Sequence, residues 1–88
     1  LPHSAAVSIE SFAELDRLTE IRACIHVERE SQKKIVIGAK GLRLKRIGSD
    51  ARRDIEILLD RKVMLRLWVK VDKGWTNQTV GLHRLGYR

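Results

Sequence analysis

The period of the hydrophobic pattern changes twice along the chain, and this change constrains the fold more than any other feature. Apolar and polar residues alternate over residues 21–27 and again over 63–71, which is the period of a half-buried strand. Between these segments apolar residues recur at offsets of three and four, which predicts a helix from about Leu42 to Leu59. Two strands must therefore be joined by a helical connection. The apolar stripe of the helix consists of Leu44, Ile47, Ala51, Ile55 and Leu58.

A further strand is predicted ahead of this unit, over residues 5–15. Ala5, Val7 and Ile9 alternate with polar neighbours, and the pattern slips at Phe12, which marks a bulge or the frayed end of the strand. A polar connection over 16–20 then leads into the strand at 21–27. These two strands are expected to pair as an antiparallel hairpin.

Helix signals fill the rest of the chain. Ser31 is placed to cap a first helix that starts near Gln32, and a glycine-containing turn at 38–41 separates it from the long helix. Thr76 can cap a last helix, about 76–85. A right-handed crossover makes the strands at 21–27 and 63–71 parallel. We therefore expect one α+β domain over 1–88, with a core of about 5–72 and a three-stranded mixed sheet carrying helices on one face.

Size and charge narrow the class of function. The 88 residues suffice for one core, and the net charge of +7 with a pI near 10.2 favours phosphate-bearing or acidic partners. The single Cys24 excludes an intramolecular disulfide. The three histidines are scattered, so no metal site is predicted, and no cofactor either. No apolar run is long enough for a membrane span, and the sequence suggests a piece of a longer protein from a reducing compartment.

The turn at 38–41 is the strongest candidate binding site. Its two glycines let the backbone approach a ligand, and the turn opens onto the first N–H groups of the next helix, which suit a phosphodiester. Lysine and arginine side chains add positive charge there, and aliphatic side chains beside the turn offer a surface for bases. The predicted binding residues for a phosphate backbone and its bases are Ile37, Gly38, Ala39, Lys40, Gly41, Arg43, Leu44 and Lys45.

Each of these features also has a purely structural interpretation. The turn can be a plain connection between helices. The basic face of the long helix, with Arg46, Arg52 and Arg53, can be a solvated surface partly paired with nearby carboxylates. Trp68 and Trp75 could stack on bases. In the structural interpretation, which we favour, Trp68 lies on the sheet face opposite the helices and packs against a neighbouring domain, and Trp75 anchors the last helix.

Residues 35–48, with the sequence IVIGAKGLRLKRIG, resemble the core of a KH domain, which carries an Ile-Gly-x-x-Gly turn between two helices. Two strands before the motif match the type II arrangement used in bacteria. Segments 27–38, 67–71, 74–75 and 85–87 further resemble the carboxy-terminal KH domain of the Era GTPase family. The resemblance implies a type II KH-like fold that here lacks its leading helix.

The same resemblance implies a function. The chain would be a non-catalytic single-stranded RNA-binding module that binds the 3′ end of small-subunit ribosomal RNA during ribosome assembly. Its partners would be that RNA, the small ribosomal subunit and a GTPase domain of the parent protein that is absent from this chain. A cytoplasmic monomer is expected.

Catalysis is not expected from the residues themselves. The sequence contains neither a Gly-x-x-x-x-Gly-Lys-Ser/Thr loop nor a Gly-x-Ser-x-Gly elbow, and salt bridges with neighbouring arginines account for Asp50 and Asp54. Two other functions compete with RNA binding. One is a protein-docking domain that uses the sheet face around Trp68. The other is association with an anionic membrane surface, which would place the chain at the inner membrane face, although the apolar stripe of the long helix is needed for the core.

Overall fold

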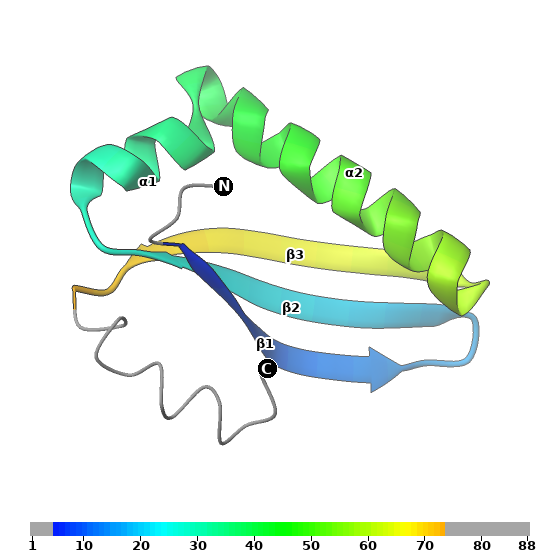
Figure 1. Cartoon of the computed structure of the whole chain (residues 1–88). Coiled ribbons are helices and arrows are strands. Elements are labelled where there is room, and N and C mark those ends of the chain that lie inside the picture. Colours follow the sequence, from blue (N-terminus) through cyan, green and yellow to red (C-terminus); the bar gives the residue numbers. More distant parts are fainter. Residues whose placement is uncertain (1–4, 74–88) are drawn as a thin grey trace.

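Two helices cover one face of a three-stranded sheet in the computed structural model, which describes residues 5–73 (Figure 1). The predicted last helix and Trp75 lie outside the described residues. A short 3-10 turn, Ala39–Gly41, joins the two helices. The elements are, in chain order, β1 (Ala6–Glu14), β2 (Leu18–Val27), α1 (Glu30–Ile37), α2 (Leu42–Leu59) and β3 (Lys62–Val71).

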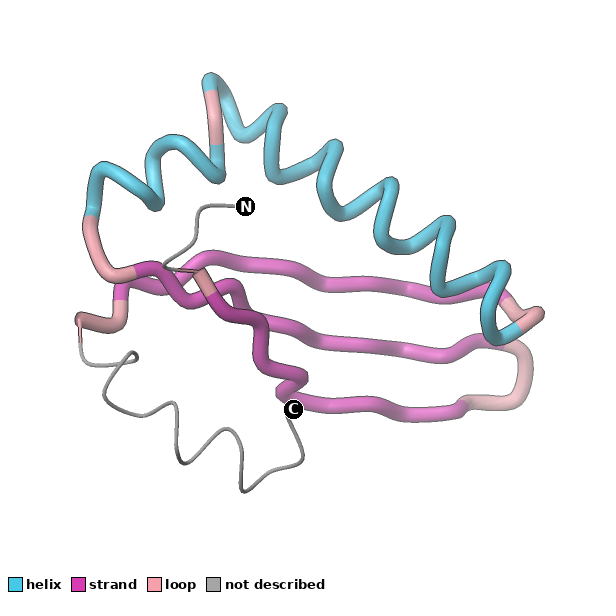
Figure 2. Tube along the Cα trace, in the orientation of Figure 1, coloured by secondary structure: helices cyan, strands magenta, loops and turns pink. Residues whose placement is uncertain are grey.

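The sheet has the order β1-β2-β3, with β2 in the middle (Figure 2). β1 and β2 form an antiparallel hairpin, and β2 and β3 run parallel from the pair Leu18 and Lys62 to the pair Val27 and Val71. The helical crossover between β2 and β3 lies on one face of the sheet (Figure 1). The predicted hairpin, parallel pair and mixed sheet are thus confirmed.

The ends of the hairpin differ from the prediction. β2 begins at Leu18 and not at residue 21, because Thr19 occupies an inward, fully buried position opposite Val63. Because this inward residue is polar, the apolar alternation begins only after it and does not reveal the start of the strand. The predicted irregularity exists, but it lies between Ile9 and Ser11 and brings Phe12 opposite Ile21. This bulge explains how Ile9 and Phe12, three residues apart, line the same side of the sheet.

The centre of the core lies between the sheet and the joint of the two helices. Ile25, Val27, Val36 and Val69 form its buried cluster, and Leu44 and Ile47 of α2 pack against it. Of the three apolar residues that end α1, only Val36 is buried, whereas Ile37 is half-buried and Ile35 is 56% exposed. This cluster fixes the start of α2 over β3, which positions the turn between the helices.

The start of α1 corrects the predicted cap. Ser31 lies inside the helix, whose N-cap residue is Arg29. The side chain of Gln32 closes the turn instead, because its Oε1 accepts hydrogen bonds from the backbone N–H groups of Glu28 (3.0 Å) and Arg29 (2.9 Å). A glutamine in the third helical position thus binds back to the residues before the helix.

α2 has the predicted bounds but is less buried than its apolar stripe suggests. None of its residues is fully buried, and Leu58 is 81% exposed. An apolar groove of about 430 Å³ runs between α2 and the sheet. Leu44 and Ile47 of the stripe pack against the buried cluster, whereas Ala51, Ile55 and Leu58 only border this groove, so the predicted burial of the stripe is confirmed only in part. The residues that line the groove include Phe12, Ile21, Ala51, Ile55, Leu58 and Leu59.

Candidate nucleic-acid interface

The turn between α1 and α2 is built from residues with positive φ. Gly38, Lys40 and Gly41 have φ values of 74°, 55° and 74°. The N–H of Gly41 donates to the carbonyl of Gly38 (3.2 Å), which closes the turn. Gly38 also packs against Arg43, which leaves no room for a side chain at position 38, whereas the space above Gly41 is open. Backbone is therefore exposed to an incoming ligand at Gly41.

The start of α2 is positively charged. No side chain caps its N-terminus, and its first turn contains no acidic residue. Ala39, Lys40 and Arg43 are exposed around the turn. The positive end of the helix dipole and two cationic side chains thus lie together, an arrangement that favours an anionic group such as a phosphate.

A groove of about 370 Å³ leads away from the turn, between α2 and β3. One wall is a single face of α2, which carries residues at successive helical turns from Gly41 to Arg52. The other wall is the inward side of β3, with Leu65 and Leu67. Polar and cationic side chains thus stand beside an aliphatic floor. The lining residues are Gly41, Leu44, Lys45, Gly48, Ser49, Arg52, Leu65 and Leu67.

The predicted site residues divide into two groups. Gly41, Leu44 and Lys45 line the groove. The other five do not line it: four of them, at 38–40 and 43, form or flank the turn at its end, and Ile37 packs against the core. The structure therefore brings seven of the eight together around the turn and the groove, and it gives Ile37 a mainly structural position.

Five further lining residues were not among the predicted site residues. Gly48, Ser49 and Arg52 continue the spacing of three and four that starts at Gly41, so extending that face along the helix would have found them. For Leu65 and Leu67, the alternation predicts only that both lie on the same side of a half-buried strand. Local pattern cannot show that β3 is an edge strand whose inward side also borders the groove.

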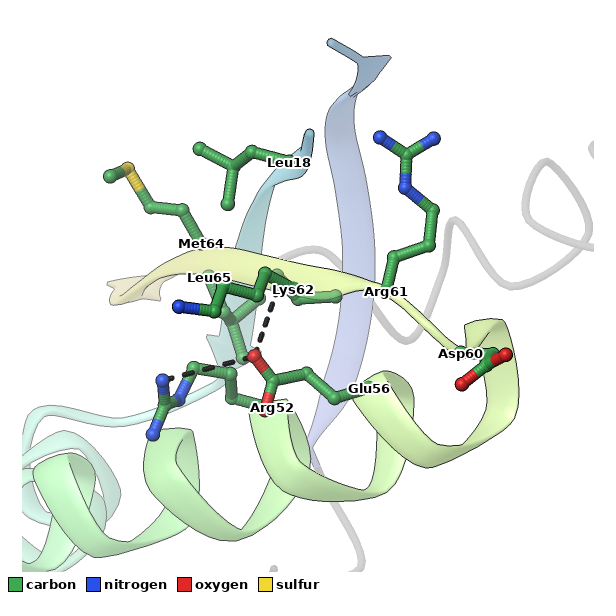
Figure 3. A pocket seen from close by; sticks show the side chains of 9 residues that line it. Leu18, Arg52, Glu56, Asp60, Arg61, Lys62, Met64 and Leu65 are labelled. Carbon is green, nitrogen blue, oxygen red and sulfur yellow. Dashed lines mark hydrogen bonds and ion pairs between the residues drawn. The ribbon is translucent and has the colours of Figure 1, made fainter. Parts of the chain in front are cut away.

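A second hollow, of about 750 Å³, adjoins the groove at the far end of α2 (Figure 3). Arg52 and Leu65 line both, so the two are neighbours. Glu56 holds this region together: its Oε2 accepts a hydrogen bond from the Val63 N–H (3.0 Å) and lies 3.9 Å from the Arg52 guanidinium. The other residues of the hollow are Leu18, Asp60, Arg61, Lys62 and Met64.

Other kinds of site find no support in the part of the chain that the structure describes. Residues 5–73 contain no group of three side chains that could hold a metal ion. Burial raises the pKa of the Cys24 thiol, and the carboxylate of Glu10 adds to this shift, so the reactive thiolate is disfavoured. Within the same residues, no helix is long and apolar enough to cross a membrane.

Comparison with known proteins gives consistent matches to one family. The family profile described as "KH domain" matches residues 1–76. The GTPase Era of Pseudomonas syringae pv. tomato is 58% identical over 87 residues, which is 99% of this chain and 29% of that protein. Era of Azotobacter vinelandii is 54% identical over 88 residues, again 29% of its length. The chain thus spans less than a third of these relatives.

Solved structures give the same result. A variant of Aquifex aeolicus Era bound to GDP·AlF4⁻ superposes with a TM-score of 0.84 at 41% identity, covering 96% of this chain and 29% of that one. A structure of Era with MgGDPNP and nucleotides 1506–1542 of 16S ribosomal RNA matches with the same values. These matches confirm the predicted α+β fold, and residues 1–76 of the chain match a KH domain.

Proposed function

The chain belongs to the KH domain family, and from this membership we propose that it binds single-stranded RNA in the groove between α2 and β3. The observation that carries the proposal is the junction of the Gly38–Gly41 turn with this groove. A cationic turn with accessible backbone stands at one end, and a mixed aliphatic and polar groove follows it. KH turns of this kind clamp about four nucleotides of backbone.

The two parts of the site take different parts of the RNA. Phosphates lie against the turn and the start of α2, where Lys40 and Arg43 add charge without reading sequence. Bases lie in the groove on the aliphatic surface of Leu44 and Leu67. The hydroxyl of Ser49 and the guanidinium of Arg52 can donate hydrogen bonds to base edges there.

The RNA that we propose is the 3′ end of small-subunit ribosomal RNA, bound during ribosome assembly in the cytoplasm. The similarity to Era, including Era bound to a 16S ribosomal RNA segment, supports this choice. The corresponding partners are the small ribosomal subunit and, in a longer parent protein, a GTPase domain. A monomeric domain suffices, because one copy supplies both walls of the groove.

One titration tests the proposal. The chain is mixed with a short single-stranded RNA, with a duplex of the same sequence and with anionic vesicles, while the amide signals of residues 38–43 are followed by NMR. We expect these signals to shift selectively with the single strand. Shifts confined to β3 around Trp68 would assign the chain to protein docking or to another surface, and a selective response to vesicles would assign it to the membrane.

A further inference from the structure

The outward side of β3, on the sheet face away from the helices, carries a regular stripe. Cationic and apolar side chains alternate along it, and all five members are exposed. Met64 and Trp68 are 40% and 39% exposed, so part of each apolar side chain is open to a ligand. We call this set the β3 stripe. Its members are Lys62, Met64, Arg66, Trp68 and Lys70.

The charges of the β3 stripe are not used within the described part of the fold. Its three cationic side chains form no ion pair with any residue of 5–73. Arg66 also pairs in register with Arg22 of β2, whose nearest carboxylate oxygen, on Glu20, is 4.0 Å away. Like charges opposite each other on neighbouring strands are destabilising. The arrangement therefore favours an anionic ligand on this face.

The spacing of the stripe fits a polyanion with planar groups better than a single anion. Cations recur every fourth residue, which places them roughly 13 Å apart along a strand. An exposed apolar or aromatic side chain stands between each two cations. Alternation of cationic and stacking side chains is the pattern by which proteins hold single-stranded nucleic acid.

The stripe also lies next to the groove. β3 is an edge strand, so its inward residues border the groove while its outward residues form the stripe. The hollow at the start of β3 connects the two sides, because it is lined both by Arg52 and Leu65 of the groove and by Lys62 and Met64 of the stripe (Figure 3). A strand that leaves the groove here can pass around the edge of β3.

We propose that the β3 stripe is a second contact surface for the same single-stranded RNA. Its cations hold phosphates, and Met64 and Trp68 contact bases. This inference rests on the proposed function, since it extends the path of an RNA bound first at the turn.

The test compares two strands from the 3′ end of small-subunit ribosomal RNA: a short one of about four nucleotides, the length that a KH turn clamps, and one about three times longer. The stripe variant is Arg66→Gln with Lys70→Gln. Its control, Arg46→Gln with Arg53→Gln, removes the same charge from exposed positions of α2. Circular dichroism melting establishes that both variants are folded.

We expect the stripe variant to bind the long strand roughly tenfold more weakly than the parent and the short strand equally well. Its logarithmic salt slope for the long strand should be smaller in magnitude by about 1.4, the value for two phosphate contacts on a single strand. The control should keep most of its affinity for both. Equal losses in the two variants would reduce the stripe to general electrostatic attraction and overturn the inference.

Tryptophan fluorescence gives a second readout. In a Trp75→Phe variant, Trp68 is the remaining tryptophan of the two in the sequence. The long strand should quench the fluorescence of Trp68 and the short strand should not.

If the short strand binds but the long strand gains no affinity from the stripe, this inference fails and the proposed function stands. If the short strand does not bind at all, the proposed function fails. Loss of vesicle binding in the stripe variant, with RNA binding intact, would assign the stripe to a membrane surface.

Discussion

Gly38 and Arg43 are packed so closely that a Cβ atom at position 38 would lie 2.6 Å from the Cβ of Arg43 and 3.1 Å from its backbone N. The contact joins the first residue of the turn to the first turn of α2. It fixes the angle at which α2 leaves the turn and thereby the position of the groove. The backbone at Gly38, with φ 74° and ψ 178°, is accessible essentially to glycine alone.

Replacement of Gly38 by alanine should therefore destabilise the domain by about 3 kcal/mol, from backbone strain and the collision with Arg43. Gly41→Ala should cost less, about 1 kcal/mol, because Gly41 has left-handed φ and ψ but open space around its Cβ position. Urea unfolding of both variants gives the two free energies. Equal costs would show that the collision is relieved by a small movement of α2.

Gly48→Ala is the matched control for these substitutions. Gly48 lies inside α2 without positive φ, and its Cβ would make an ordinary contact, 3.9 Å, with Leu67. Alanine should stabilise the helix there by about 0.5–1 kcal/mol. Because the new methyl group enters the groove, the same variant should bind RNA more weakly while melting at a higher temperature. Higher stability together with weaker RNA binding would show that the methyl group acts on the binding groove and not on the fold.

The side chain of Gln32 should contribute measurably to stability. Gln32→Ala removes the acceptor of two backbone N–H groups, those of Glu28 and Arg29, and should cost about 1–2 kcal/mol. Gln32→Glu keeps an oxygen at the same place near a helix N-terminus and should preserve most of the stability. The free energy of unfolding at neutral pH checks both. An equal loss of stability in the two variants would show that the side-chain oxygen does not account for the contribution of Gln32.

Glu56 should matter more as an acceptor for backbone than as an ion-pair partner. Glu56→Ala leaves the N–H of the buried Val63 without its acceptor and should cost about 1–2 kcal/mol. Arg52→Ala removes only a half-exposed ion pair at 3.9 Å and should cost less than about 0.5 kcal/mol. Thermal or urea unfolding measures the difference. If Arg52→Ala costs as much as Glu56→Ala, the ion pair dominates.

The long elements of the fold were predictable because their period is set by one large packing surface. α2 and β3 each carry one side that faces the core, and the predicted bounds of α2, 42–59, agree with the structure. Errors fell where a single side chain decides the local geometry. Thr19 is polar yet buried, and Gln32 rather than Ser31 closes the start of α1.

Only the part of the candidate site that is contiguous in sequence could be predicted. The turn and the first residues of α2 follow from the glycine spacing, because they are neighbours in sequence. The opposite wall of the groove, with Leu65 and Leu67, depends on the position of β3 at an edge of the sheet, next to α2. That is a tertiary relationship, and period-two alternation describes an inward residue without saying whether it borders a core or a groove.

Binding of RNA should depend on salt. If the site neutralises roughly three phosphates of a single strand, the logarithmic slope of the association constant against salt should be about −2. Affinity should then fall on the order of 20-fold between 50 and 200 mM salt. Fluorescence anisotropy of a labelled short strand measures the slope. A slope near zero would show that the cations around the turn do not contact phosphate.

The last prediction separates the fold from the function at the turn, by replacing Ala39 and Lys40 together with aspartate. Both positions are exposed, aspartate tolerates the left-handed backbone of residue 40, and a carboxylate before α2 interacts favourably with the helix dipole. Stability should therefore change by less than about 1 kcal/mol. The affinity for RNA should fall, because each carboxylate stands where a phosphate must lie and the ammonium of Lys40 is lost.

Repulsion between two such charges at 4 Å amounts to about 1 kcal/mol in water and about 4 kcal/mol at an effective dielectric constant of 20. Binding of a short single strand should thus weaken at least about tenfold, since 1.4 kcal/mol corresponds to a factor of ten. Melting temperature and anisotropy titration of the same preparation measure the two effects together. If this double variant melts like the parent and still binds the short strand equally well, the groove between α2 and β3 is not the binding site. The RNA contact would then have to lie on the opposite face of the sheet, around Trp68.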